Sequence, residues 1–388
     1  MKKVVIKSSL CLLAVFIVSC NNNEDNTEPL AGVTKKQAIE NYANIAYANY
    51  KQAYDDAVIL ENAITMFTTN PTQENFNNTK AKWKTARESY GTTEAFRFAD
   101  GPVDDVDGPE SLINSWPLDE NYIDYVNGAS TSGIINDPIT FSVIDKNVIS
   151  GQNENGGEKN ISTGYHAIEF LLWGQDLTAP SANLAGQRPY TDYVAGGTAS
   201  NQSRRGLYLR VCADLLTDNL DELVNQWKVG GTYRATFLSL NEDVALKNMY
   251  TGICTLAGAE LSTERMDVAL GNADQEDEHS CFSDNTHRDI FLNLQGCINV
   301  YNGTYGAITG PSLKDLVNQV NTTTHSETSS SETLCVTKIN AILTPFDLAI
   351  SGGVSSPEGT KVRAAVLQLK NYSANLIAGA SKIGITVN

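Results

Sequence analysis

The chain has 388 residues, of which 45 are acidic and 28 are basic, and its formal net charge is −17. This acidic balance argues against binding to nucleic acid and against electrostatic adhesion to anionic lipid. The length is sufficient for two ordinary domains or one long one.

The first twenty residues predict a lipoprotein signal peptide, residues 1–20. Three lysines precede a short apolar run from Leu10 to Val18, and Ile17-Val18-Ser19-Cys20 has the pattern of a lipobox. The run is too short to span a bilayer, which favours a removed signal over the alternative of an anchor helix. We therefore expect a lipidated Cys20, a flexible tether over 21–33, and a protein anchored in the cell envelope, facing the periplasm or the cell surface.

Beyond the tether, apolar and aromatic residues recur at helical spacing, and strand-like alternation is almost absent. Helices are expected at 34–67, from Thr72 onward, and at 203–227, 242–270, 286–301, 312–320, 336–350 and 359–383. Residues 127–157 look rich in loops, and the polar Ser/Thr run 322–333 is expected to be a solvated loop. The predicted fold is all-α, with an N-terminal bundle at 34–180 and a C-terminal bundle at 203–386.

One of these helical stretches carries the motif Gly164-x-His166-x-x-Glu169. Positions i and i+3 share one face of a helix, so the imidazole and the carboxylate can converge on one cation. The alternative is a local brace, in which Glu169 is only hydrogen-bonded to the imidazole. The chain has four histidines, and two more of them, His279 and His287, lie in one acidic stretch.

Several motifs together resemble the imelysin family, also called the M75 peptidase-like family, which includes iron-regulated envelope proteins and relatives of periplasmic iron-uptake lipoproteins. The motifs are Gly164-x-His166-x-x-Glu169, Glu94-Ala95-Phe96-Arg97 with Gly101-Pro102, Glu264-Arg265-Met266, the stretch 275–287, and Asn299 to Gly303. The resemblance spans residues 35 to 385. It implies two helical-bundle halves packed around a shared cleft that the signature residues face.

We expect that cleft to gather residues from both halves of the chain. The candidate metal ligands are His166, Glu169, Glu94, Asp100, His279 and His287, and the candidate cleft-lining residues are Arg97, Glu278 and Asp284. Ser283 is expected to cap the helix that holds His287.

Three classes of function stay open at this point. A metallopeptidase needs three protein ligands and a base, but the chain has no His-Glu-x-x-His, and Phe170 stands where an inverted motif has its second histidine. A binding protein can use imidazole and carboxylate ligands for iron, zinc or copper, or can hold haem through His166. In the third class the motif only braces the two halves of a structural envelope protein. The expected partners are a metal ion or haem, the membrane through Cys20, and an envelope transport protein, and nucleic acid is not expected.

Overall fold

The first two helices begin where the sequence predicts them. In the computed structural model, which describes residues 32–387, α1 (Lys35–Thr69) starts after Thr34, whose side chain accepts a hydrogen bond from the amide of Gln37 in a capping box. Asn70-Pro71 interrupts the helical pattern. Thr72 then caps α2 (Gln73–Thr93) by accepting from the Asn75 amide.

The rest of the chain is also helical, apart from loops and one short hairpin. The first half continues with η1 (Glu94–Phe96), α3 (Glu110–Ile113), α4 (Glu120–Ile123), η2 (Ile134–Asn136), α5 (Lys146–Gln152), α6 (Gly164–Trp173), η3 (Pro180–Ala182) and η4 (Tyr190–Tyr193). The second half has α7 (Gln202–Trp227), α8 (Thr232–Ser239), α9 (Glu242–Thr255), η5 (Leu256–Asp267), α10 (Val268–Asn272), η6 (Gln275–Asp277), η7 (Cys281–Ser283), α11 (Thr286–Asn302), β1 (Thr304–Tyr305), β2 (Ile308–Thr309), α12 (Leu313–Val320), α13 (Thr322–Ile339), α14 (Phe346–Ile350) and α15 (Pro357–Lys382).

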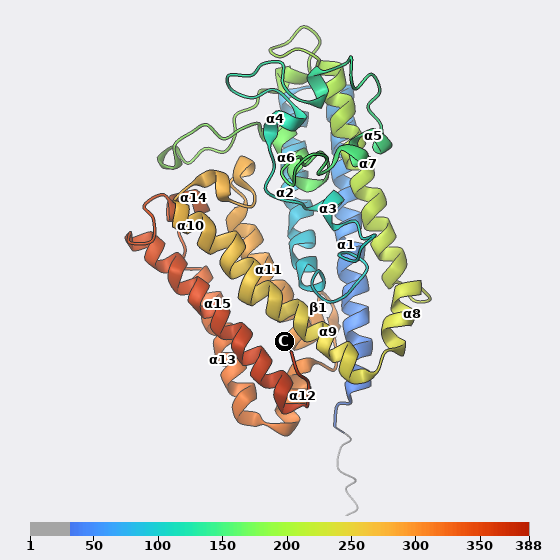
Figure 1. Cartoon of the computed structure of the whole chain (residues 1–388), viewed down its shortest axis with the longest axis vertical. Coiled ribbons are helices and arrows are strands. Elements are labelled where there is room, and N and C mark those ends of the chain that lie inside the picture. Colours follow the sequence, from blue (N-terminus) through green and yellow to red (C-terminus); the bar gives the residue numbers. More distant parts are fainter. Residues whose placement is uncertain (1–31, 388) are drawn as a thin grey trace, which may run out of the picture. The chain divides into compact units, whose positions relative to one another are not determined.

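The long helices form two groups (Figure 1). In the first, α1 packs along both α2 and α7. In the second, α15 packs along α13 and along η5, a π-helical segment that continues α9. Helix α11 contacts α2 and so connects the groups. Helix α7 follows the predicted boundary near residue 180, yet its most extensive contacts are with α1. The all-α prediction is confirmed, and β1 pairs with β2 in an antiparallel hairpin.

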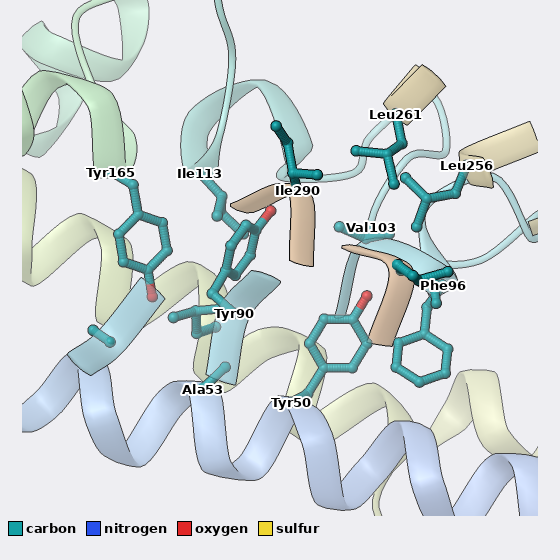
Figure 2. Close-up of a cluster of buried hydrophobic side chains, with 14 of the residues drawn as sticks. Tyr50, Ala53, Tyr90, Phe96, Val103, Ile113, Tyr165, Leu256, Leu261 and Ile290 are labelled. Carbon is teal, nitrogen blue, oxygen red and sulfur yellow. The ribbon is translucent and has the colours of Figure 1, made fainter. Parts of the chain in front are cut away.

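The hydrophobic core runs through both groups without interruption. Residues 33–387 belong to one compact unit. Figure 2 shows Tyr50 of α1 and Tyr90 of α2 in the same cluster as Leu256 and Leu261 of η5 and Ile290 of α11. Such burial is the dominant favourable term in folding, so the two groups stabilise each other.

The expected loop at 322–333 is wrong, because this run forms most of α13. Three of its hydroxyls bond within the helix: Thr328, Ser330 and Thr333 each donate to the carbonyl four residues earlier. One side of the helix is buried against α15, at Thr324, Thr328, Ser331, Cys335 and Ile339. The helix expected at 336–350 is also corrected, since α13 ends at Ile339 and α14 begins only at Phe346.

The predicted signal peptide, Cys20 and most of the tether lie outside the described residues. Between residues 32 and 387, no helix has the length and apolar character needed to cross a membrane.

Candidate functional site

The motif Gly164-x-His166-x-x-Glu169 forms the first turns of α6, which is buried along its whole length. Gly164 has φ +81°, and a Cβ atom there would lie 2.4 Å from the carbonyl oxygen of Ile113. Only glycine therefore allows α6 to start this close to α3. His166 Nδ1 lies 3.0 Å from Glu169 Oε2, and both side chains are fully buried.

The second half of the chain supplies a matching histidine–carboxylate pair. His279 Nδ1 lies 3.0 Å from Oδ2 of Asp289, on the first turn of α11. The rings of His166 and His279 meet edge to face, with their centroids 4.6 Å apart, and the indole of Trp116 lies against both. The structure thus places His166 and His279 side by side, and their sharing of one metal site stays a prediction.

The His279–Asp289 pair is anchored by a buried arginine of α2. Arg87 Nη2 lies 3.0 Å from Asp289 Oδ1, and Arg87 Nη1 donates to Asn114 Oδ1 at 2.6 Å. Burial raises the pKa of Asp289, but Arg87 and the hydrogen bonds from His279 and Ser280 outweigh it and leave the pKa well below its ordinary value. Asp289 is therefore a carboxylate at neutral pH.

Both imidazoles are neutral at neutral pH. Burial, together with the charges of His279 and Arg87, lowers the pKa of His166 well below its ordinary value. Burial and the charge of Arg265 lower the pKa of His279 to about 4, although Asp289 acts in the opposite direction. Because Asp289 is ionised, His279 Nδ1 carries the proton that it donates, which leaves a lone pair on Nε2.

Glu169 is held on its other oxygen by Ser283. Oε1 of Glu169 accepts from the Ser283 amide at 3.0 Å and from its hydroxyl at 2.7 Å. Burial still raises the pKa of Glu169 to about 8. The predicted role of Ser283 as a helix cap is wrong, because α11 begins after Asn285 and Ser283 binds Glu169 instead.

An acidic pocket of about 460 Å³ opens beside His279 and Trp116. We call it the acidic pocket, and its charged lining residues are Arg97, Glu110, Glu154, Glu158, Glu260, Glu264, Arg265 and Asp277. Six carboxyl groups thus face two guanidinium groups, and burial raises the pKa of one of them, Glu110, to about 7. Pockets with such an excess of negative charge concentrate cations.

Glu94 belongs to the wall behind this pocket rather than to its surface. Its Oε2 lies 2.6 Å from Arg265 Nη2, and its Oε1 accepts from Asn114 at 3.4 Å. Burial raises the pKa of Glu94, but Arg265 and Arg97 outweigh it and hold the pKa at about 2. Both carboxylate oxygens of Glu94 thus have partners, and Glu94 holds the side chain of Arg265 in place.

The other candidate residues lie elsewhere. Asp100 is exposed, with φ +55°, and contacts Asn248. His287 lines a separate, mostly apolar pocket of about 160 Å³. Glu278 is buried and Asp284 half-buried, and neither lines the acidic pocket. The structure therefore brings His166, Glu169, His279, Glu94 and Arg97 together, but not these four residues.

Sequence reasoning missed Arg87, Asn114, Trp116 and Asp289. For Arg87 a signal was present, because it follows Trp83 and precedes Tyr90 on the apolar face of α2. An arginine on a buried stripe needs a buried anion. No comparable signal marked Asn114 or Trp116, which lie in the loop after α3.

Within residues 32–387, no three His, Cys, Asp or Glu side chains converge on one point where a metal ion could be held. Instead, each imidazole Nδ1 faces a carboxyl oxygen of its own pair: His166 faces Glu169, and His279 faces Asp289. His166 Nε2 is nevertheless buried without a hydrogen-bond partner.

A comparison with protein families defines the class of protein. The imelysin model (Peptidase M75) matches residues 46–376, and the chain therefore belongs to the imelysin family.

Individual relatives are more distant. The chain is 25% identical over 278 residues to iron-regulated protein A of Synechococcus elongatus, a match that covers 69% of this chain and 64% of that protein. A crystal structure from Parabacteroides distasonis, described as an iron-regulated protein A precursor, has a TM-score of 0.67 at 20% identity and covers 92% of this chain and 97% of its own. An imelysin-like protein from Psychrobacter arcticum gives 0.64 at 10% identity, with 92% and 100% covered. These two structures share the fold.

Proposed function

We propose that the protein binds a metal ion as cargo, with iron as the preferred metal, and that His166 and His279 are the histidine ligands. The observation that carries the proposal is the pairing of two neutral imidazoles whose centroids are 4.6 Å apart, each held at Nδ1 by a buried carboxyl group. Metal-binding histidines are oriented in this way, because an ionised carboxyl group fixes the ring and leaves Nε2 for the metal. Asp289 is already ionised, whereas burial raises the pKa of Glu169 to about 8, so binding at His166 requires Glu169 to lose its proton as the metal arrives.

The buried Nε2 of His166 supports the same proposal. This atom has no hydrogen-bond partner within the described residues. A buried polar atom without a partner costs about 1–3 kcal/mol, which a bond to a metal would offset. The ring of His279 stands next to that of His166, with the two centroids 4.6 Å apart.

The chemistry of the site favours iron, zinc or copper over calcium or magnesium, since imidazole is a ligand for the former group. The acidic pocket beside His279 attracts cations. The relation to a protein named iron-regulated protein A makes iron the first metal to test.

Hydrolysis has less support than cargo binding. A catalytic zinc ion uses three protein ligands and keeps one position for water, whereas the described residues offer two neighbouring imidazole rings and no group of three ligands. We infer that water, or a molecule that arrives with the metal, supplies the other ligands from the side of the acidic pocket.

The test is a titration of residues 21–388, freed of metal by dialysis against a chelator. Ferrous iron under anaerobic conditions, ferric citrate and zinc are each added and followed by calorimetry. His166→Gln and His279→Gln should each weaken iron binding by at least tenfold, which is the scale of losing a metal ligand or its support. His287→Gln and His325→Gln are the matched controls, since His287 lines another pocket and His325 lies on α13.

Two results would contradict the proposal. One is iron binding that is unchanged in both site variants while their melting temperatures stay normal. The other is cleavage of an unfolded protein substrate that depends on added zinc and is lost in His166→Gln, which would establish the peptidase. A shifted haem absorption band that is lost in His166→Gln would replace iron by haem as the cargo.

We further propose that the mature protein begins at a lipidated Cys20 and serves an envelope transport partner. A Cys20→Ala variant should stay unprocessed or leave the membrane fraction, as shown by fractionation and intact mass. If the variant still fractionates with membranes at the size of the mature protein, the lipid anchor is wrong.

A further inference from the structure

A second pocket, of about 640 Å³, lies at the opposite end of α6 from His166. The helix has ten residues, which corresponds to a length of about 15 Å. We call it the Arg188 pocket. It is lined by Tyr125, Val126, Asn127, Gly128, Ser130, Gly174, Gln175, Leu177, Thr178, Gln187, Arg188 and Pro189. It shares no lining residue with the acidic pocket.

The lining of this pocket is positively charged, which is unusual in so acidic a chain. Arg188 is the one charged residue that lines it, although the chain has 45 acidic and 28 basic residues. The acidic pocket, by contrast, presents six carboxyl groups. Among these two pockets, only the Arg188 pocket suits an anionic ligand.

The guanidinium of Arg188 is held rigidly by one of its three nitrogens. Nη1 lies 2.7 Å from Asp124 Oδ2 and 3.5 Å from Asp192 Oδ2. The planar group also stacks between the rings of Tyr125 and Phe170, at 4.9 and 5.2 Å from their centroids. Its position and orientation are thus fixed before any ligand arrives.

The other edge of the guanidinium is not used by the protein. Within residues 32–387, every side-chain hydrogen bond of Arg188 is donated by Nη1, and Nε is buried without a partner. The N–H groups of Nε and Nη2 are parallel and match the two oxygens of a carboxylate. An unpaired donor on a side chain that is 2% exposed costs free energy, which a bound carboxylate would offset.

The remaining lining residues suit the body of a small polar molecule. Asn127, Gln175 and Gln187 contribute amide groups, and Ser130 contributes a hydroxyl at the exposed rim. Gly174, at φ +70°, has no side chain beside Arg188, and a Cβ there would lie 3.2 Å from Arg188 Cβ. The volume is within the range of about 300–1,000 Å³ that is typical of small-molecule sites.

We propose that the Arg188 pocket binds a small carboxylate ligand that carries amide or hydroxyl groups, with Arg188 as the anchor for the carboxylate. This site is independent of the proposed metal site, because the two share no residue. The same chemistry is offered by a short peptide with a free C-terminus and by an acidic sugar.

Ligand-observed saturation-transfer NMR on residues 21–388 tests the proposal with two pairs of probes. The acids are N-acetylglycine and D-glucuronate, and their neutral counterparts are N-acetylglycinamide and D-glucose. We expect at least one acid to bind at least about tenfold more tightly than its neutral counterpart. Tighter binding of N-acetylglycine indicates a peptide-like ligand, and tighter binding of D-glucuronate indicates a sugar acid.

Variants locate the binding. Ser130→Trp fills the pocket from its exposed rim and should abolish the signal, whereas Ser142→Trp, on an exposed residue outside the pocket, should leave it unchanged. Arg188→Lys keeps the charge next to Asp124 but removes the fork, and should weaken binding of the acid about tenfold. The proposal is overturned if neither acid gives a signal at about 10 mM, if the neutral probes bind equally well, or if Ser130→Trp binds like the wild type.

Discussion

Outside the candidate site, Asp124 is a buried carboxyl group that accepts from two arginines. Arg205 donates to both of its oxygens, at 2.6 and 2.9 Å, and Arg188 donates to Oδ2 at 2.7 Å. Asp124 and Arg205 are fully buried. Burial raises the pKa of Asp124, but the two guanidinium groups outweigh it and bring the pKa below its ordinary value of 3.8.

Asp124→Asn should therefore destabilise the protein by about 3–5 kcal/mol at neutral pH, because Arg205 loses its carboxylate and Arg188 keeps only the longer contact with Asp192. A carboxyl group whose pKa is lower in the folded state contributes stability above its unfolded pKa and loses it as the pH falls through the folded value. The difference from wild type in urea unfolding should thus be full at about pH 7 and shrink below about pH 4. A difference that stays constant down to about pH 3 would contradict this account.

Site residues that lie close together in the sequence could be predicted as pairs, whereas those far apart could not. His166 and Glu169 were predictable as a pair because three residues along a helix bring side chains together. The partner of His279 was not, because His279 lies in the loop between η6 and η7, and no periodicity relates it to Asp289 on α11. His287 shows the opposite error: it lies close to His279 in sequence, but α11 directs it into another pocket.

At the scale of elements, the start of α6 depends on one glycine. Gly164→Ala would place a Cβ 2.4 Å from the Ile113 carbonyl at φ +81°, and the backbone strain alone costs about 1–3 kcal/mol. We expect a clear fall in melting temperature, together with loss of metal binding as α6 and α3 separate.

Gly151→Ala is the matched control. Gly151 lies within α5, and nothing lies within 4 Å of the position its Cβ would take. Replacing a helical glycine by alanine should stabilise the protein by about 0.5–1 kcal/mol. Equal melting temperatures for the two variants would show that Gly164 has no special role.

Helices were predicted best where apolar residues repeat at helical spacing, as in α1 and α7. They were predicted worst where polar side chains form hydrogen bonds to the backbone of their own helix, as in α13. Composition favours a loop at 322–333, because Ser and Thr compete for backbone hydrogen bonds. In α13 that competition is resolved within the helix, and the residues that pack on α15 are partly hydroxyl-bearing. The helix predicted at 242–270 includes η5, which carries Arg265 to the acidic pocket, but its spacing did not reveal that this segment is π-helical.

At the scale of the whole molecule, the packing of α1 against α7 determines whether the first half of the chain can fold without the second. Fifteen residues of α1 are buried, and α7 covers part of that surface. A fragment of residues 34–180 lacks α7, so the surface of α1 that α7 covers would be exposed to solvent. We expect this fragment to unfold without a cooperative transition in circular dichroism, whereas residues 32–387 unfold cooperatively. A sharp, two-state transition of the fragment would show that the first half is an independent domain.

The all-α class could be predicted from periodicity alone, but the shared core could not. Helical spacing shows which face of each helix is apolar, and it does not show which helix covers that face. Tyr50, Tyr90, Leu256 and Ile290 belong to one buried cluster, which joins segments that lie far apart in the chain (Figure 2).

The most direct test of the central claim is anomalous scattering from crystals soaked in ferrous iron under anaerobic conditions, with data collected on both sides of the iron absorption edge. The proposal predicts one strong peak between His166 and His279, at about 2.0–2.3 Å from each Nε2. A peak in another part of the molecule, with the space between these two rings empty, would contradict it.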